Sequence, residues 1–191
     1  MPDYVCTHRM KATGAEEPTD AALIAAYRGG SERAAAELVG RHATALGRYL
    51  YAAGAGPSEV DDFAQEALFR AFRRLDGWRG DASFRSWLFA IAGNLLKDDF
   101  RRRKGRTLQS IEDADAAASS DPETELVAAD AERRLRDALA GLPRLQREVF
   151  LLRAQQGFDY PAIASTLGTT PGAARVHYHH AVRKLKEICH G

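Results

Sequence analysis

The chain has 191 residues, 45% of them hydrophobic, and its 27 Lys and Arg nearly balance its 26 Asp and Glu. This apolar share is normal for a globular protein, so a buried core is possible. No run of about 18 apolar residues occurs, so we expect no membrane-spanning segment. The stretch from Met1 to Asp20 lacks an apolar core, so we expect no secretory signal.

Charge changes sharply along the chain. The segment Lys97–Arg106 is basic, Thr107–Glu132 carries only acidic charges, and basic residues outnumber acidic ones from Arg133 onward. Two basic modules around an acidic connector are typical of a protein with two separate polyanion contacts. The alternative is a set of solvated faces whose charges cancel.

Helix signals fill the first half after a tail, residues 1–18, that has no periodicity and is expected to be disordered. Asp20 can cap a helix that runs through Tyr27, and a second helix extends from about residue 31 to 53. Ser58 is the expected cap of a third helix over 59–75. A loop over 77–82 then leads to Ser83, which can cap a fourth helix over 84–103.

The second half starts after a stretch rich in Ala, Ser and Asp that is typical of a linker. Helices are expected over about 130–141 and 143–156, followed by the two helices of a helix-turn-helix near the C-terminus. No strand pattern occurs. The predicted fold class is all-α, with two small helical domains joined by a flexible acidic linker. The expected boundaries are 1–18 (tail), 19–106 (first domain), 107–132 (linker) and 133–191 (second domain).

The third predicted helix has an apolar stripe and a polar outer face. The outer face carries Asp62, Gln65, Glu66, Phe69 and Arg73. A large aromatic ring on a polar stripe indicates a contact site, although a single exposed aromatic residue is also common.

The segment Tyr160–Leu185 is a helix-turn-helix pattern. Asp159 can cap its first helix, Gly168 supplies the turn, and Thr170 with Pro171 starts the second helix. The second helix is expected to bury Ala174, Tyr178, Ala181, Leu185 and Ile188 and to offer Arg175, Val176, His177, His179, His180, Arg183 and Lys184 on its other faces. Such a helix fits the DNA major groove, where Arg175 could pair with guanine. The alternative is a helical hairpin that binds no DNA.

Three motifs in this order resemble the extracytoplasmic-function (ECF) RNA polymerase sigma factors. Asp62, Gln65, Glu66, Arg70 and Ala71 match the D-x-x-Q-E-x-x-x-R-A signature of the family's domain two, and Arg79–Leu88 is similar to its next conserved pattern. Leu142–Arg153 resembles the start of domain four. The resemblance covers about 21–106 and 133–188.

The resemblance implies roles for the first domain. Its third helix would bind core RNA polymerase through Asp62, Gln65, Glu66, Phe69 and Arg73. The unpaired −10 strand, with one base flipped into a pocket, would be bound by Gly80, Asp81, Ala82, Ser83, Asn94, Lys97, Arg101 and Arg102. Stacking on an aromatic side chain can offset the free energy that is lost when a base leaves the stack. Phe84 and Trp87, however, lie on the buried stripe and are expected in the core.

The same resemblance implies that the second domain binds the duplex −35 element through Thr170, Arg175, Val176, His179, His180, Arg183 and Lys184. The recognition helix departs from the family's common pattern, so its DNA sequence cannot be carried over from relatives. Ala90 and Gly93 stand where the family often has basic residues, which implies weaker strand contacts there. Family members are often held by an anti-sigma partner, and the resemblance implies one here.

No catalytic constellation or phosphate loop occurs, so we expect a protein that is not an enzyme. His177 and His180 lie three residues apart, but no further ligand is nearby, and Cys6 with His8 could meet Cys189 and His190 only if the termini came together. We therefore expect no metal and no cofactor.

Two cysteines at opposite ends favour the reducing cytoplasm. There the protein would lie on the nucleoid or be held at the membrane through an anti-sigma partner. The competing hypothesis is a dimeric helix-turn-helix regulator with a helical sensing domain.

Overall fold

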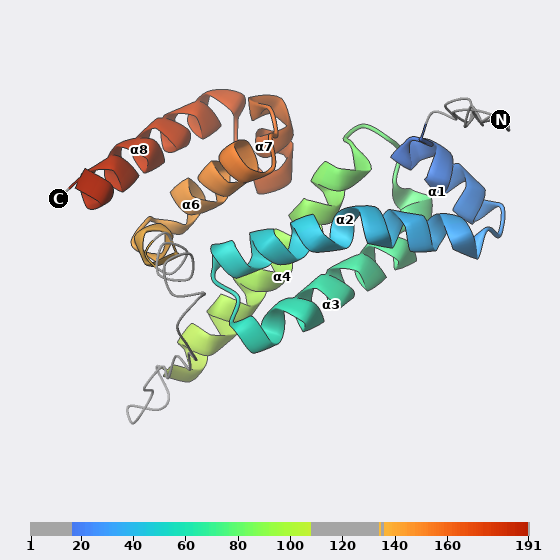
Figure 1. Cartoon of the computed structure of the whole chain (residues 1–191), viewed down its shortest axis with the longest axis horizontal. Helices are drawn as coiled ribbons and strands as arrows, with labels where there is room; N and C mark the ends of the chain where they lie inside the picture. Colours follow the sequence, from blue (N-terminus) through green and yellow to red (C-terminus); the bar gives the residue numbers. More distant parts are fainter. Residues whose placement is uncertain (1–16, 108–133, 135, 191) are drawn as a thin grey trace, which may run out of the picture.

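The computed structural model describes residues 17–107, 134 and 136–190 (Figure 1). The N-terminal half contains α1 (Asp20–Arg28), α2 (Glu32–Ala53), α3 (Val60–Arg73) and α4 (Phe84–Thr107). The C-terminal half contains α6 (Arg144–Phe150), α7 (Tyr160–Leu167) and α8 (Pro171–His190). Residues 136–140 are also helical, while the predicted start of that helix lies outside the described residues. No strand occurs in the described part of the chain, which confirms the all-α prediction.

The helices of the N-terminal half form a bundle in which α2, α3 and α4 run beside one another and α1 packs on α2 (Figure 1). In the C-terminal half, α6 packs against α8, and α7 packs against both α8 and α4. A π-helical turn, Leu151–Gln155, continues α6 and contacts α2. The two halves therefore touch each other through α4 with α7 and through α2 with the π-helical turn.

Most predicted helix starts are confirmed by side chains that accept hydrogen bonds from free backbone N–H groups. Asp159 caps α7 by accepting from Ala162 N at 2.8 Å, and Thr170 caps α8 by accepting from Ala173 N at 3.1 Å. Ser83 accepts from Ser86 N at 3.1 Å at the start of α4. These caps fix where the helix-turn-helix and the loop before α4 begin.

Two of the predicted caps are wrong. Thr19, not Asp20, caps α1, because the Asp20 carboxylate instead accepts hydrogen bonds from Arg41 and His42 on α2. Ser58 lies inside a short 3₁₀ turn, Pro57–Glu59, and α3 starts after it at Val60. In both places a partner or a turn that the local pattern does not reveal changes the start of the helix.

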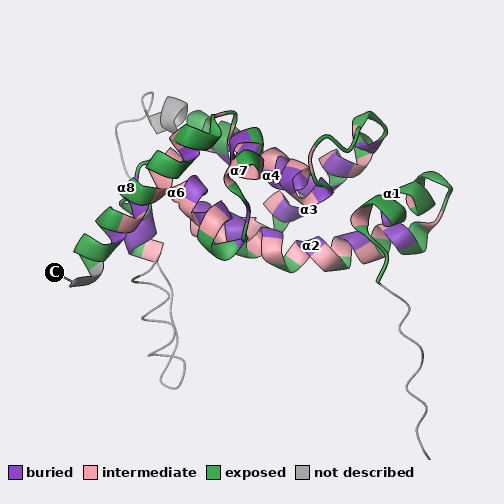
Figure 2. Ribbon diagram, turned by 90° about the horizontal axis from the view of Figure 1, so that it is seen from above, coloured by how far each residue is buried: buried purple, intermediate pink, exposed green. Residues whose placement is uncertain are grey.

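The apolar stripes predicted from helical periodicity form the core (Figure 2). On α3 the stripe buries Ala64, Ala67, Leu68 and Ala71. Phe84 is buried, as expected, whereas Trp87 is half-buried against it, with ring centroids 6.1 Å apart. Ile188 was expected in the core but is 46% exposed near the end of α8.

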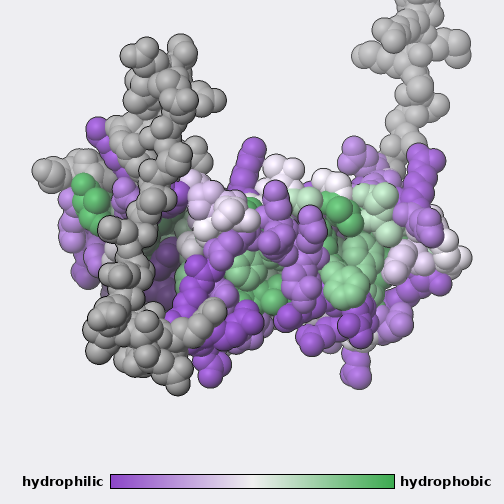
Figure 3. Space-filling view, turned by 90° about the horizontal axis from the view of Figure 1, so that it is seen from below, coloured by the Kyte–Doolittle hydropathy of each residue, from purple (hydrophilic) through white to green (hydrophobic). Residues whose placement is uncertain are grey.

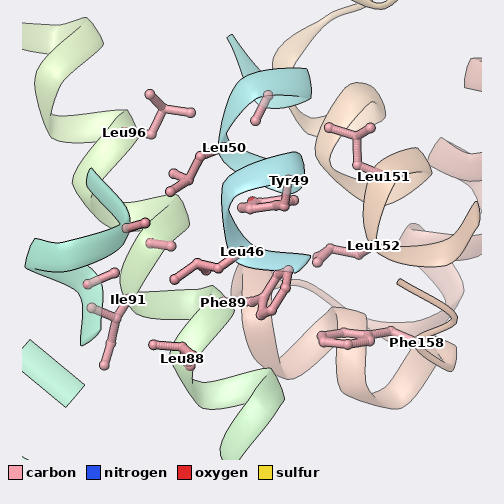
Figure 4. Close-up of a cluster of buried hydrophobic side chains, with 14 of the residues drawn as sticks. Leu46, Tyr49, Leu50, Leu88, Phe89, Ile91, Leu96, Leu151, Leu152 and Phe158 are labelled. Carbon is pink, nitrogen blue, oxygen red and sulfur yellow. The ribbon is translucent and has the colours of Figure 1, made fainter. Parts of the chain in front are cut away.

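The core is continuous between the two halves of the chain (Figure 4). Leu46 and Tyr49 from α2 and Phe89 from α4 face Leu151, Leu152 and Phe158 from the C-terminal half. All six are buried. The sequence predicted two tethered domains, and it did not indicate that they pack together.

Candidate polymerase- and DNA-binding surfaces

The outer face of α3 presents an exposed aromatic ring among charges. Phe69 is 56% exposed, and the Arg73 guanidinium lies 5.6 Å from the centre of its ring. Glu66 forms an ion pair with Arg70 at 2.6 Å. A shallow hollow of about 350 Å³ is lined by Glu66, Phe69, Arg70, Arg73 and Arg74.

This face has the character of a protein-binding surface. Asp62 and Gln65, also predicted for it, are exposed on the same helix. An exposed ring flanked by charged groups can serve as an anchor that a partner buries, surrounded by polar contacts that set specificity. All five residues predicted for polymerase binding therefore lie on one helix. No other element in the described part of the chain covers the face that they form.

Gly80–Ser83 forms a loop ahead of α4 that is held in shape from within. Gly80 has φ +82°, a conformation that side-chain-bearing residues rarely adopt. The Trp78 indole Nε1 donates a hydrogen bond to the Ala82 carbonyl oxygen at 3.2 Å. Gly80, Asp81 and Ser83 are exposed, and Ala82 is half-exposed. Hydrogen bonds of Trp78 and Ser83 therefore fix the shape of the loop, while its outer surface remains exposed.

The sequence patterns did not single out Trp78. Its ring packs edge-on against Phe84, with centroids 6.4 Å apart, while its indole N–H holds the loop. Arg28 of α1 supports the same region by donating to the carbonyl oxygens of Leu75 and Trp78. The position of this tryptophan just before the Gly80–Asp81 turn could have indicated its role, because an indole N–H that is buried needs a nearby hydrogen-bond acceptor.

The remaining predicted −10 residues follow along α4. Asn94, Lys97 and Arg101 are exposed, and their spacing of three and four places them on one helical face. Arg102 is also exposed and lines, with Arg101, a hollow of about 490 Å³ between α3 and α4. Asn94 lies about 16 Å along the helix from Ser83. The structure thus arranges these residues as a track and not as one pocket.

The basic end of this track is weakly paired. Arg101 and Arg102 lie 3.8 Å and 3.6 Å from Asp98 and Asp99, and both arginines are largely exposed. The Arg101–Asp98 pair is exposed on both sides and contributes about 0–1 kcal/mol, so a phosphate can replace it at little cost. Gly93, by contrast, is buried: a Cβ there would lie 3.1 Å from the Tyr49 hydroxyl. Its small size serves the packing of α4 on α2.

The helix-turn-helix is formed by α7 and α8 as expected. Gly168 ends α7 with φ +65°, and Ile163, Ala174 and Ala181 are buried between the helices. All residues predicted to contact the −35 element are exposed: Thr170, Arg175, Val176, His179, His180, Arg183 and Lys184. Val176 is 52% exposed, which is unusual for an apolar side chain flanked by polar ones.

Arg175 and Lys184 contact other parts of the second domain. The guanidinium of Arg175 lies 5.1 Å from the centre of the Tyr160 ring, which Arg153 approaches at 5.0 Å. Lys184 Nζ donates to the Gly141 carbonyl oxygen at 2.7 Å. Tyr160 was not among the predicted site residues, and it holds Arg175 by a cation–π contact.

The described histidine side chains of α8, His177, His179 and His180, belong to no candidate metal cluster. No group of three or more His, Cys, Asp or Glu side chains in the described part of the chain could hold a metal ion. Cys6 and His8, and the side chains of Cys189 and His190, lie outside what the structure describes.

One buried histidine supports the N-terminal half. His42 on α2 is 4% exposed, and its Nε2 lies 2.8 Å from Asp20 Oδ2. Burial lowers the pKa of His42, and Asp20 offsets this only in part. His42 is therefore neutral near pH 7 and donates its Nε2 proton to Asp20, tying α1 to α2.

Comparisons with known proteins match both halves of the chain. The family model "Sigma-70 region 2" matches residues 38–106, and "Sigma-70, region 4" matches residues 132–185. RNA polymerase sigma factor CnrH of Cupriavidus metallidurans is 33% identical over 181 residues, covering 90% of this chain and 95% of that protein. The ECF RNA polymerase sigma-E factor of Escherichia coli K12 is 30% identical, with 84% and 88% covered.

Solved structures show the same fold. CnrH in complex with the cytosolic domain of CnrY has a TM-score of 0.71 and 28% identity, and it covers 89% of this chain and 96% of that chain. The sigma factor RpoE in complex with the anti-sigma factor NepR from Bartonella quintana has a TM-score of 0.66 and 22% identity, with 80% and 94% covered.

The fold and the two matched regions define a transcription initiation factor with polymerase- and promoter-binding parts. The chain belongs to the sigma-70 family of RNA polymerase sigma factors, in its ECF group. The hypothesis of a dimeric regulator with a sensing domain is not favoured, because region 2 occupies the place of the sensor. In the described part of the chain, no helix is both long and apolar enough to cross a membrane.

Proposed function

We propose that this sigma factor binds core RNA polymerase through the outer face of α3. The face consists of Asp62, Gln65, Glu66, Phe69 and Arg73. Its exposed ring, which a partner can bury, supports this assignment. In this proposal the protein acts only by binding polymerase and DNA, and no step of its function requires a catalytic group or a cofactor.

The track from Gly80 to Arg102 binds the unpaired strand of the −10 element. The observation that carries this proposal is the ordered but exposed loop Gly80–Ser83, which continues directly into an exposed face of α4. Loop atoms and Asn94 can bond base edges, while Lys97, Arg101 and Arg102 neutralise phosphates. The exposed face of α8 binds the −35 duplex in the major groove.

An anti-sigma partner holds the protein when it is not needed. This proposal rests on the similar solved structures, in which CnrH and RpoE are each bound by another protein. CnrY is represented there by a cytosolic domain, so a partner of that kind would hold this chain at the membrane. Released, the chain would lie on the nucleoid with polymerase.

The −10 assignment is tested by Asn94→Ala. We expect the variant to form closed promoter complexes nearly as well as the wild type but to open the promoter roughly 10-fold less, since one good base contact is worth about 1–3 kcal/mol. Opening is measured by the reactivity of unpaired thymines towards permanganate, and closed complexes by gel shift at low temperature. Thr44→Ala, exposed on α2, is the control. An equal loss in both assays would place Asn94 outside strand opening.

A further inference from the structure

Val176 is an apolar side chain on the exposed face of a cationic helix. It is 52% exposed and is the sixth residue of α8, which starts at Pro171. From Pro171 to Lys186 the chain carries four Lys or Arg residues and no Asp or Glu. Figure 3 shows a face of the molecule on which hydrophobic side chains gather between hydrophilic ones. Val176, by contrast, has no large apolar side chain three or four residues away on its helix.

The helix around Val176 leaves its methyl groups uncovered. Side chains on a helix lean toward its N-terminus, so the side chain of Val176 lies over position 172. Gly172 has no side chain, and no atom lies within 4 Å of where its Cβ would be. A valine in a helix occupies mainly one χ1 rotamer, so a contact costs Val176 little conformational entropy. The methyl groups are therefore both accessible and fixed in direction.

The neighbouring Arg175 is held by an aromatic support. Its guanidinium lies 5.1 Å from the centre of the Tyr160 ring, and Tyr160 packs edge-on against Tyr178, with ring centroids 6.4 Å apart. Tyr178 in turn stacks on Phe150 of α6, with centroids 6.0 Å apart. The support fixes the guanidinium relative to α8. Arg175 and Val176 thus present a planar group of donors and an apolar surface side by side.

These two groups match the chemistry of two bases in the major groove. Guanine offers the acceptors N7 and O6, which a guanidinium can bond with two donors, and thymine alone among the four bases carries a C5 methyl group. Consecutive residues of a helix rise by about 1.5 Å and consecutive base pairs by about 3.4 Å. Arg175 and Val176 therefore lie close enough together to contact adjacent base pairs.

Charge and side-chain type favour DNA over a protein as the partner of this surface. A helix face with cations and no acid between Pro171 and Lys186 is complementary to phosphates. Valine is also under-represented among the side chains that anchor protein interfaces. The other exposed apolar residue of α8, Ile188, lies about 18 Å further along the helix axis, so the two side chains do not form one apolar patch.

We propose that Val176 contacts the C5 methyl group of a thymine in the −35 element, next to a guanine that Arg175 bonds. Val176 thereby makes the element specific for one T·A pair, because any other pair lacks a methyl group at that place. This inference rests on the proposed binding of α8 to the −35 duplex and adds the identity of two adjacent bases. Uracil tests it directly, since uracil pairs as thymine does but has no C5 methyl group.

The experiment uses promoters located by mapping the RNA 5′ ends that core polymerase makes with the full chain. Each thymine of the −35 element is replaced singly by uracil, on either strand, and each guanine by 7-deazaguanine, which lacks the N7 acceptor. Competition gel shifts at low temperature measure how tightly the complex of core polymerase and chain binds each fragment. The wild type is compared with Val176→Ala, Arg175→Ala and Ile188→Ala. The last is the matched control, because it removes an exposed apolar side chain from the same helix.

We expect one thymine at which uracil weakens binding of the wild type about fourfold, the effect of burying one methyl group. In Val176→Ala this difference between thymine and uracil should disappear, whereas Ile188→Ala should keep it. The thymine should adjoin the guanine whose 7-deaza form weakens the wild type but not Arg175→Ala.

Three results would overturn the inference. The first is a difference between thymine and uracil that persists in Val176→Ala, and the second is a −35 element in which no thymine shows such a difference. The third is equal weakening of Val176→Ala on every fragment, which would assign the side chain to folding or to a contact with polymerase. A complex with no preference at all for the −35 element would overturn the proposed role of α8, and this inference with it.

Discussion

Phe69 is the side chain on which the polymerase-binding assignment depends most. It is 56% exposed on α3, so removing its ring leaves the core intact. We expect Phe69→Ala to weaken core polymerase binding by about 2 kcal/mol or more, as for a central aromatic anchor. The affinity can be measured by competition between labelled wild type and unlabelled variant for core polymerase.

A matched control comes from Ile188, which is 46% exposed at the other end of the molecule. Ile188→Ala should bind polymerase as the wild type does, and both variants should melt at the wild-type temperature. Wild-type affinity in Phe69→Ala would remove α3 from the interface.

Arg175 is the residue of α8 best suited to a guanine. It is exposed, and its guanidinium rests on the Tyr160 ring, which limits the side-chain freedom lost on binding. We expect Arg175→Ala to reduce discrimination at one −35 base pair by about 1–3 kcal/mol while leaving −10 dependence unchanged. Transcription from promoters with single −35 substitutions measures this, with the exposed Arg48→Ala as control. Equal loss of −35 and −10 dependence would contradict separate modules.

His42 gives the N-terminal half a dependence on pH. Because burial lowers its pKa below the ordinary 6.5, the unfolded chain binds the proton more readily than the folded one. Its contribution to stability is therefore present above pH 6.5 and is lost as the pH falls below that value. We expect His42→Gln, which keeps a donor for Asp20 but does not titrate, to lose less stability between about pH 7.5 and 5.5 in urea unfolding. An identical decline in both chains would contradict a neutral buried histidine.

Among the helical elements, the turn between α7 and α8 depends on one backbone conformation. Gly168 has φ +65°, and no atom lies within 4 Å of where its Cβ would be. Strain alone therefore decides the effect, and we expect Gly168→Ala to destabilise the chain by about 1 kcal/mol. Gly172 of α8 also has open space but an ordinary φ, so Gly172→Ala should be neutral or stabilising. Thermal melts compare the two, and equal effects would contradict the strain.

The sequence predicted the helix starts correctly where the capping side chain and the backbone N–H that it binds are close in sequence. The caps Asp159, Thr170 and Ser83 each bond a backbone N–H three residues on, so spacing alone reveals them. Asp20 misled the prediction because its carboxylate binds Arg41 and His42, more than 20 residues away. Periodicity placed most buried stripes correctly. It failed at Ile188, which is 46% exposed near the end of α8.

The exposed faces of α3, α4 and α8 could be predicted because helical spacing and family motifs coincide on them. Trp78 and Tyr160 could not, since their roles depend on which backbone carbonyl or guanidinium the fold brings near. The packing of Phe89 on Phe158 was not predicted either, because Phe158 lies in the non-helical segment before α7, where helical periodicity gives no signal.

At the scale of the whole molecule, two packed helical halves carry the proposed polymerase-binding face, the proposed strand-binding track and the proposed duplex-binding helix. The proposed polymerase-binding face on α3 and the proposed strand-binding track on α4 share one helical bundle. The proposed duplex-binding helix, α8, belongs to the C-terminal half. This division accounts for a sigma factor built from weak modules that gain affinity when polymerase holds them together.

The central claim is that this chain directs core polymerase to promoters with two separated elements. The most direct measurement is transcription in vitro on genomic fragments, with purified core polymerase alone and with the added chain, read by mapping RNA 5′ ends. We predict new start sites that share sequence elements centred near −10 and −35. A folded chain that binds duplex DNA as a dimer and produces no new start sites would contradict the account.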